Sequence, residues 1–177
     1  PVILDSTLAI KSDKALANYM QNSGYFDAKV THEVQYKKRK AIVAYTITPG
    51  EAWKISTVMY PRPTFKTDSI VWQNHAKSVL KTDQRFDVTK LKAERERIEN
   101  ELQNSGFYYF TKDYVTFDLD TSVANHKVKI NVIISQQSDS AEHLQYWMNN
   151  IYSITDFGMG DAVNRNEKRD TLQKKEF

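Results

Sequence analysis

Residues 21–26 read Gln-Asn-Ser-Gly-Tyr-Phe, and residues 103–108 read Gln-Asn-Ser-Gly-Phe-Tyr, 82 positions further along the chain. Four identical residues followed each time by an aromatic pair indicate an internal repeat, because their surroundings match as well. Leu16 and Ile98 share the same separation of 82 residues, and so do Met20 and Leu102. The chain is therefore expected to contain two related structural units in tandem.

An amphipathic helix is predicted in front of the glycine in each copy. Apolar residues recur at helical spacing on one stripe, as Leu16, Tyr19 and Met20 and then as Leu91, Ile98 and Leu102. Ser12 is the expected N-cap of the first helix and Asp87 that of the second. Gly24 and Gly106 are expected to end the two helices in the left-handed conformation that favours glycine.

Two strands with alternating apolar residues are predicted after each glycine. They span 26–36 and 41–47 in the first copy, and 108–119 and 128–134 in the second. Because the second turn is longer, the separation between the copies grows from 82 to 87 residues at their ends. Such growth at a loop is what a structural repeat should show.

Further elements are predicted in front of and behind the second copy. Residues 53–58 predict a strand and residues 68–80 a helix, so the complete unit has the order β–α–α–β–β over about 53–136. Only residues 1–11 precede the helix of the first copy, and we expect the chain to begin partway through that unit. Tyr146–Ile151 repeats the apolar pattern of 53–58 and predicts the first strand of a third unit. The polar stretch Gly158–Phe177 is expected to be poorly ordered.

The order and spacing of these motifs resemble the POTRA domains of BamA/TamA-like outer-membrane β-barrel assembly and translocation factors. The resemblance rests on Ser-Gly-Tyr-Phe at 23–26, on Thr-Pro-Gly-Glu at 48–51 leading into Trp-Lys-Ile at 53–55, and on the helix signature at 86–107. It covers roughly residues 1–155 and implies an α+β fold of tandem βααββ modules. Each module would be a three-stranded mixed sheet covered by two helices.

The resemblance also implies how the chain is divided and what it does. Residues 1–52 would be the C-terminal part of one POTRA unit, 53–140 a complete unit, and 141–177 the first strand of a further unit with a polar tail. The function implied is a periplasmic scaffold of a Gram-negative bacterium that binds unfolded outer-membrane clients, lipoprotein clients or accessory proteins. Contact with the membrane would come only through a C-terminal β-barrel outside this sequence.

Strand addition at an open sheet edge is the expected binding mode, because an edge strand presents unpaired N–H and C=O groups. In the family the second strand of a module is the proposed edge, which implies residues 26–36 and 108–119 here. The partner-binding candidates are Phe26, Ala28, Lys29, Val30, Thr31, Tyr108, Tyr109, Phe110, Thr111 and Tyr114. Structural roles are expected for Gly24, Gly106 and Trp53. The alternatives are that these edges are solvated or touch neighbouring subunits.

No catalytic residue, cofactor or metal site is predicted. The chain has no cysteine, its four histidines lie in different predicted elements, and it contains no glycine-rich phosphate loop. The glutamates between residues 94 and 101 alternate with basic residues, which favours a solvated helix face over a catalytic pair. No apolar run approaches the roughly 18 residues needed to span a bilayer.

Nucleic-acid binding is the alternative class, through a KH-like βααβ module. Residues 80–87 contain no glycine, whereas a KH domain needs a Gly-x-x-Gly loop between its helices. Aspartates beside the aromatic residues of 108–117 would repel phosphate, so no nucleic-acid partner is expected. The basic run Lys37–Lys40 is interpreted as a solvated hairpin tip rather than a site for an anionic partner.

The joint between the two units is expected to be short and closely packed. Only Pro49, Gly50, Glu51 and Ala52 lie between the last strand of the first unit and the first strand of the second. Four residues reach at most about 14 Å, and the proline stiffens one of them. Trp53 is therefore expected to bury its ring at or near the joint.

Overall fold

The computed structural model describes residues 6–38, 40–123, 125–138, 142–150, 152–154 and 171–173. Residues 1–144 form one compact unit, and residues 145–177 form a second. The polar stretch Gly158–Phe177, expected to be poorly ordered, lies outside the described residues apart from 171–173. No helix in the described part of the chain combines the length and the hydrophobicity needed to cross a membrane.

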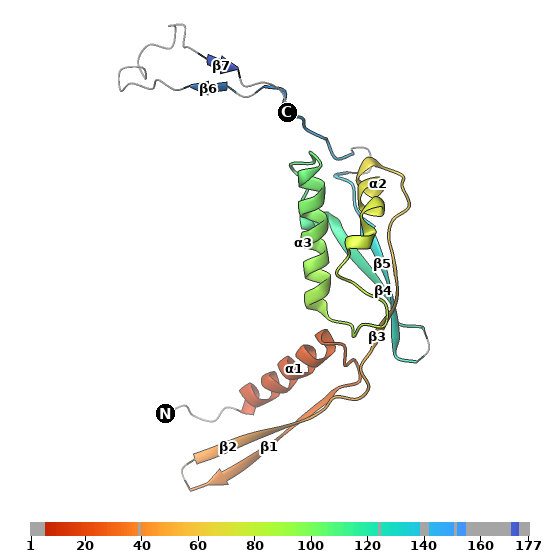
Figure 1. Cartoon of the computed structure of the whole chain (residues 1–177). Helices are drawn as coiled ribbons and strands as arrows, with labels where there is room; N and C mark the ends of the chain where they lie inside the picture. The colour runs from red at the N-terminus through yellow and green to blue at the C-terminus, as the bar shows by residue number, and fades with distance from the viewer. Residues whose placement is uncertain are drawn as a thin grey trace, which may run out of the picture. The chain divides into compact units, whose positions relative to one another are not determined.

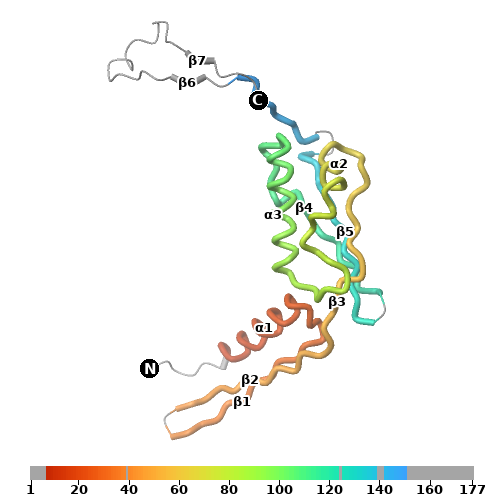
Figure 2. The backbone as a smooth tube through the Cα atoms, viewed as in Figure 1, coloured from red at the N-terminus to blue at the C-terminus, as the bar shows by residue number. Residues whose placement is uncertain are grey.

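The first module contains one helix and a β-hairpin. Its elements are α1 (Ser6–Asn22), β1 (Lys29–Lys37) and β2 (Lys40–Thr48) (Figure 1). β1 and β2 pair antiparallel along their whole length, from Lys29↔Thr48 to Lys37↔Lys40. The helix lies along the hairpin, as the backbone trace also shows (Figure 2). His32 of β1 contacts Asp13 of α1, with Nδ1 2.5 Å from Oδ2.

The second module contains the complete βααββ order. Its elements are β3 (Lys54–Met59), α2 (Lys66–Gln73), the 3-10 turn η1 (His75–Lys77), α3 (Val88–Asn104), the 3-10 turn η2 (Lys112–Tyr114), β4 (Val115–Asp120) and β5 (Lys127–Ile134). The strand order in the sheet is β3-β5-β4. β3 is parallel to β5, and β4 is antiparallel to it. The predicted α+β fold with a mixed three-stranded sheet is confirmed.

The hydrophobic core of the second module lies between the sheet and the two helices. β5 contributes every second residue to it, namely Val128, Ile130, Val132 and Ile134, all buried. Val132 and Ile134 pack with Val71 of α2 and with Ile98 and Leu102 of α3. Val128 and Ile130 pack with Leu91 of α3 and with Ile55, Leu80 and Phe86. The alternation predicted for 128–134 and the helical stripe predicted for 91–102 are therefore both present, and they face each other.

The helices α1 and α3 have the same length and occupy equivalent positions in the two copies. Each has 17 residues, and α3 begins 82 positions after α1. Asp87 caps α3 as predicted, since its carboxylate accepts a hydrogen bond from the Thr89 N–H at 2.8 Å. The cap predicted at Ser12 is wrong, because α1 begins six residues earlier and the Ser12 hydroxyl donates to the Leu8 carbonyl inside the helix. In the sequence, Asp5 stands 82 residues before Asp87.

Both helices end in the same glycine motif. Gly24 has φ +88° and Gly106 has φ +96°, in the left-handed region as predicted. The next residue closes the helix end in each copy. Tyr25 N–H donates to the Met20 carbonyl at 2.9 Å, and Phe107 N–H donates to the Leu102 carbonyl at 3.0 Å. The Gln-Asn-Ser-Gly repeat in the sequence therefore corresponds to the same helix-terminating turn in both modules.

Three predicted boundaries are wrong. The helix predicted over 68–80 spans 66–73, and its C-terminal part is replaced by η1. The strand predicted over 108–119 begins at Val115, because Phe107 and Phe110 both point into the core and the Phe110 N–H donates to the Phe107 carbonyl in a turn. That spacing of three belongs to a turn rather than to an alternating strand. The strand predicted from Phe26 begins at Lys29.

The second compact unit contains one short antiparallel strand pair. β6 (Tyr152–Ile154) pairs with β7 (Thr171–Gln173). A strand was expected over 146–151, but the described residues 146–150 form none. An apolar pattern alone does not hold a strand in place, because a strand needs a paired neighbour to satisfy its backbone groups.

Candidate functional site: the module joint and the open sheet edge

Backbone hydrogen bonds connect the first module to the second at Trp53. The Trp53 N–H donates to the Gly24 carbonyl at 2.8 Å, and the Phe86 N–H donates to the Trp53 carbonyl at 2.9 Å. The main chain of Trp53 therefore lies between the end of α1 and the segment that leads into α3. Trp53 therefore lies at the joint, where its ring was expected to be buried, and the residue is half-buried.

An aromatic side chain of the first module packs against the core of the second. The ring of Phe26 lies 5.1 Å from that of Trp53, nearly edge-on, and 5.2 Å from that of Phe86. Phe86 is buried in the cluster that includes Ile55 and Leu91. Aromatic pairs of this geometry contribute about 0.5–1.5 kcal/mol each beyond their buried area. Phe26 is thus a joint residue rather than a member of strand β1.

Gly24 allows the two modules to approach closely. A Cβ atom at this position would lie 2.5 Å from the Phe86 carbonyl oxygen, which belongs to the main chain. Real Cβ atoms do not come so near to another heavy atom, and a backbone oxygen cannot rotate away. Gly24 therefore serves two purposes, since it ends α1 with a positive φ and leaves room for the second module.

Three polar side chains, Asp27, Glu51 and His126, lie at the joint. Asp27 accepts a hydrogen bond from the Trp53 indole at 3.3 Å. His126, from the turn between β4 and β5, has its Nδ1 3.0 Å from a carboxylate oxygen of Glu51 and its Nε2 3.7 Å from Asp27. These groups are largely exposed, so each pair contributes little to stability. Their arrangement nevertheless connects the linker, the first module and the β4–β5 turn.

One edge of the three-stranded sheet, β3, is covered at its first two residues. The Ile55 N–H of β3 donates to the Gln84 carbonyl, and the Asp83 N–H donates to the Ile55 carbonyl, both at 2.8 Å. Arg85 forms a further bridge with Lys54. The register with β5 then shifts between Ile55 and Thr57, which interrupts the strand. A bulge and a covering segment are two ways in which proteins protect a sheet edge.

The other edge of this sheet is β4. In the described part of the chain, no backbone–backbone hydrogen bond from outside the sheet reaches its six residues. Its solvent-facing side chains include Asp118 and Asp120, and the hydrogen bond from the Ser122 hydroxyl lowers the pKa of Asp120. Charged side chains on an edge discourage unspecific association. The second strand of the module is therefore its open edge, as the resemblance implied.

The predicted contact residues divide into several environments. Lys29, Val30 and Thr31 lie in β1, whereas Phe26 and Ala28 precede it. None of the second set lies in β4, since Tyr108, Tyr109, Phe110 and Thr111 occupy the turn after α3 and Tyr114 ends η2. Phe110 is buried in the core, while Tyr108 and Tyr109 are exposed with their rings 5.2 Å apart. The edge strand itself is Val115–Asp120, which the prediction placed too early.

A buried histidine holds the segment after β5. His143 is buried, and its Nε2 lies 3.0 Å from the Ser135 carbonyl oxygen. Its ring packs edge-on against Phe110 and Tyr114, with centroids 4.9 and 4.5 Å away. This contact was not predicted from the sequence, because the three rings come from separate segments that only the fold brings together.

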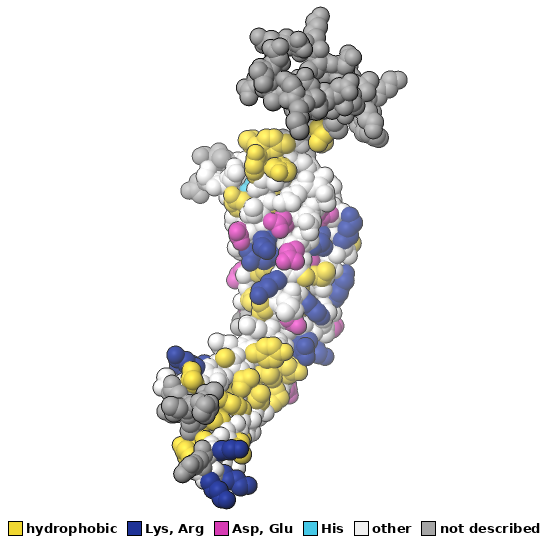
Figure 3. Space-filling model, turned by 90° about the vertical axis from the view of Figure 1, so that its left-hand side faces the viewer, with side chains coloured by type: hydrophobic (Ala, Val, Ile, Leu, Met, Phe, Trp, Pro, Cys, Tyr) yellow, Lys and Arg dark blue, Asp and Glu magenta, His cyan; other side chains and the backbone are white. Residues whose placement is uncertain are grey.

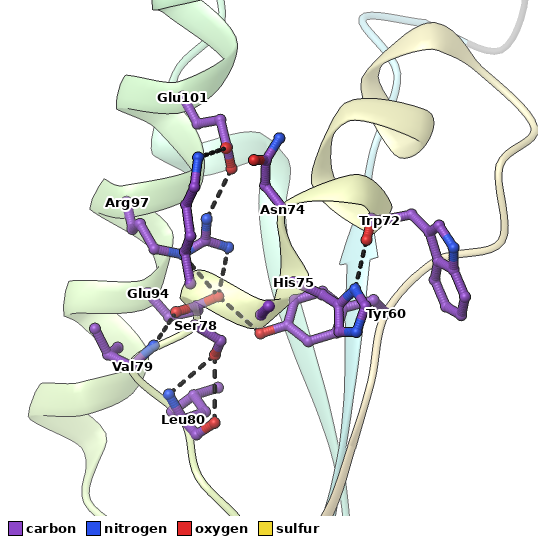
Figure 4. A network of polar contacts seen from close by, with 12 residues as sticks. Tyr60, Trp72, Asn74, His75, Ser78, Val79, Leu80, Glu94, Arg97 and Glu101 are labelled. Atoms are coloured by element: carbon purple, nitrogen blue, oxygen red, sulfur yellow. Dashed lines mark hydrogen bonds and ion pairs between the residues drawn. The ribbon is translucent and has the colours of Figure 1, made fainter.

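A buried carboxylate was also missed. Glu94 of α3 is completely buried, whereas its alternating charged neighbours predicted a solvated face. Its carboxylate accepts hydrogen bonds from the Tyr60 hydroxyl at 2.8 Å and from the Val79 N–H at 2.9 Å (Figure 4). The Arg97 guanidinium donates to it as well, at 2.8 Å, and also contacts Glu101 at 2.7 Å.

This network attaches the segments around α2 to α3. Tyr60 follows β3 and Val79 follows η1, so one carboxylate fixes both ends of the α2 region (Figure 4). Burial raises the pKa of Tyr60, and the neighbouring Glu94 adds to the effect. Each oxygen of Glu94 accepts from a neighbouring group, which is the arrangement of a structural buried charge. In the described ranges, no group of three or more His, Cys, Asp or Glu residues is arranged to hold a metal ion.

Comparisons with known proteins support the fold. No protein-family model matches the chain, and no curated protein does either. Among solved structures, the POTRA3–5 fragment of BamA from Haemophilus influenzae is similar over 98% of this chain and 81% of that chain, with a TM-score of 0.50 and 12% identity. This chain has the POTRA fold.

Two further solved structures with POTRA domains are similar at lower scores. BamA from Haemophilus ducreyi lacking POTRA domains 1–3 aligns with 76% of this chain at 12% identity, with a TM-score of 0.47. This chain spans 24% of that protein. POTRA1–3 of Omp85 from Anabaena aligns with 77% of this chain and 53% of its own length at 19% identity, with a TM-score of 0.37. At these identities the POTRA similarity concerns the fold alone.

Proposed function

We propose that this chain is part of a periplasmic POTRA arm of an outer-membrane assembly or translocation protein from a Gram-negative bacterium. In this proposal its modules bind unfolded outer-membrane polypeptides, lipoprotein clients or accessory proteins by strand addition, without catalysis. The observation that carries the proposal is the open edge β4 in a sheet whose other edge, β3, is covered at Lys54 and Ile55 by residues 83–85.

Strand addition at β4 would be weak and tolerant of sequence. A partner strand would pair with the backbone of six residues, and each net hydrogen bond contributes about 0.5–1.5 kcal/mol. Because these bonds involve the main chain, many different apolar segments could bind. Such tolerance suits a module that meets many unfolded clients. The first module offers a similar edge along β1, where Lys29, Val30 and Thr31 lie.

We further propose that the chain contains three POTRA segments, with boundaries at 1–52, 53–140 and 141–177. The first module has α1, β1 and β2 but no counterpart of β3 or α2 among its described residues. Tyr45 and Ile47 of β2 are 37% and 40% exposed, whereas the equivalent Val132 and Ile134 of β5 are at most 9% exposed. A strand parallel to β2 and a helix like α2 would cover this face and complete the module.

The alternative of RNA binding by a KH-like module is less well supported. A KH domain grips the nucleic-acid backbone with a Gly-x-x-Gly loop between its helices. The segment between α2 and α3, residues 74–87, contains no glycine. Asp118 and Asp120 on the open strand would repel phosphate.

Nuclear magnetic resonance tests the proposed binding mode directly. The full chain, labelled with ¹⁵N, is titrated with peptides taken from strands of an outer-membrane barrel protein. Amide shifts are expected in Val115–Asp120 of β4, or in Lys29–Lys37 of β1, and little change is expected in Lys54 and Ile55, whose edge is covered. The matched control is the same peptide with a central proline, which lacks the N–H needed for pairing. Shifts confined to the helices, or equal shifts with both peptides, would contradict strand addition.

A further inference from the structure

The turn of the β1–β2 hairpin carries four consecutive basic residues, Lys37–Lys40. Lys37 pairs with Lys40 at the last position of the register, so the turn is tight, and Lys38 adopts a φ of +54°. No ion pair in the described part of the chain involves Lys37, Lys38 or Lys40. No carboxylate in the described part of the chain therefore neutralises the positive charge of these three lysines.

Apolar side chains flank this basic turn on both faces of the hairpin. Tyr36 is 76% exposed and Ile42 is 54% exposed. Directly opposed residues share one face of an antiparallel pair. Tyr36 is opposite Ala41 and Ile42 is opposite Gln35, one position further from the turn, so the two side chains lie on different faces. A hollow of about 600 Å³ is bordered by Lys37, Lys38, Lys40, Ala41 and Ile42.

This combination is specific to the first module. The equivalent turn of the second module, residues 121–126, contains no lysine or arginine, and its His126 is engaged at the joint. β1 has nine residues where β4 has six, so the first hairpin is longer by about 10 Å at 3.4 Å per residue. In Figure 3, Lys and Arg side chains lie at the end of the first module beside hydrophobic ones, and others are spread over the second module. The POTRA fold does not require such a turn.

We propose that this hairpin tip, formed by Tyr36, Lys37, Lys38, Lys40 and Ile42, docks on the surface of an anionic lipid bilayer. Lysine and arginine are attracted to anionic headgroups, and tyrosine and isoleucine insert at the boundary with the acyl chains. A bilayer surrounds an inserted tip on all sides, which suits apolar side chains on both hairpin faces. A folded protein or a nucleic acid would contact mainly one face.

The charge gives the expected strength of the contact. The three lysines of the tip together raise the apparent affinity for an anionic surface by on the order of a hundredfold. The attraction is screened over about 8 Å at physiological ionic strength, so binding should weaken with salt. This site would give the chain a membrane contact of its own, beside the one through a β-barrel that the resemblance implied. It does not depend on strand addition at β4.

Vesicle co-sedimentation of the full chain tests the proposal. The probes are vesicles of phosphatidylcholine alone and vesicles with one third phosphatidylglycerol, at low and high salt. The tip variant is Lys37→Gln, Lys38→Gln and Lys40→Gln together. The control variant replaces three exposed lysines outside the hairpin, namely Lys66→Gln, Lys81→Gln and Lys92→Gln. Circular dichroism spectra are to establish that both variants fold before binding is compared.

The wild type and the control are expected to bind the anionic vesicles, and the tip variant is expected to bind about a hundredfold more weakly. A second variant, Tyr36→Ser with Ile42→Ser, keeps the charge and should lose the binding that remains at high salt. Equal binding by the tip and control variants would overturn the proposal. Equal affinity for both kinds of vesicle, or tighter binding to a single-stranded oligonucleotide than to the anionic vesicles, would overturn it as well.

Discussion

The substitution Gly24→Ala tests the joint at the point where the modules approach most closely. Glycine at this position has φ +88°, and an added Cβ would lie 2.5 Å from the Phe86 carbonyl oxygen. The overlap cannot be relieved by a change of rotamer, because the oxygen belongs to the main chain. The variant must therefore either distort the end of α1 or move the first module away from the second.

The expected loss of stability follows from the contacts that such a movement would break. A positive φ costs an alanine about 1–2 kcal/mol. Separation of the modules also removes the hydrogen bond from the Trp53 N–H to the Gly24 carbonyl, which contributes about 1 kcal/mol. The two aromatic contacts of Phe26 contribute a further 1–3 kcal/mol or so. We therefore expect a total loss of about 4 kcal/mol.

Gly50→Ala is the matched control. Gly50 also has a positive φ, +73°, but the nearest atom to its added Cβ is the Asp27 Cβ at 3.3 Å. That contact requires a shift of only a few tenths of an ångström, far less than the overlap at Gly24. Only the conformational cost of about 1–2 kcal/mol should remain. The difference between the two variants isolates the contribution of the joint.

Urea unfolding followed by tryptophan fluorescence measures both free energies, and small-angle scattering measures the radius of gyration in the absence of urea. Gly24→Ala should unfold at clearly lower urea than Gly50→Ala and should have the larger radius of gyration. Equal unfolding free energies and equal radii for the two variants would refute the reasoning, because the close contact would then contribute nothing.

Three further predictions concern the second module. Glu94→Gln should lower the free energy of unfolding in urea by about 2–3 kcal/mol, because Arg97 and Tyr60 lose a charged acceptor. The control is Glu96→Gln, because the side chain of Glu96 is 59% exposed, and it should change the free energy of unfolding by less than about 0.5 kcal/mol. Similar losses for the two variants would contradict the role of Glu94. Burial raises the pKa of Tyr60, so the neutral hydroxyl is favoured in the folded state. The contribution of Tyr60 to the free energy of unfolding is therefore complete below about pH 10, the ordinary tyrosine pKa, and is lost as the pH rises further. Tyr60→Phe should therefore lose less stability than the wild type between pH 9 and 11, and parallel urea midpoints would count against this. The hydrogen bond from Thr89 lowers the pKa of Asp87, so the stabilisation by this cap is present above about pH 4 and is lost as the pH falls further. Asp87→Ala should lose about 1 kcal/mol at pH 7, and Asp87→Asn should lose less but show a weaker acid dependence in thermal unfolding.

The features that the sequence predicted correctly are those determined locally. Gly24 and Gly106 end helices because a left-handed residue is needed at one defined place. The alternation of residues 128–134 survives in the structure because one face of β5 is buried along its whole length. Such signals depend on a few neighbouring residues, so a single sequence is enough to identify them.

The features that were missed depend on contacts between distant segments. Glu94 is buried because Tyr60 and Val79, which are 34 and 15 residues away in the chain, supply its donors. The residue of α1 that corresponds to Glu94 is Ser12, so the repeat did not indicate a buried charge at this position. The turn at 107–110 was mistaken for a strand because four consecutive aromatic residues also suit a strand by composition.

The covering of β3 also limits how many copies of the module can join. A sheet with two open edges can add a neighbour on each side and grow into a fibre. Two modules that pair through β4 leave mainly the β3 edges outside, and these are occupied at Ile55 and interrupted before Thr57. Growth of this sheet beyond a pair is therefore hindered, whereas the first module has its own two-stranded sheet. At high concentration this limits the growth of the second module's sheet, while each unpaired copy keeps β4 available for a partner.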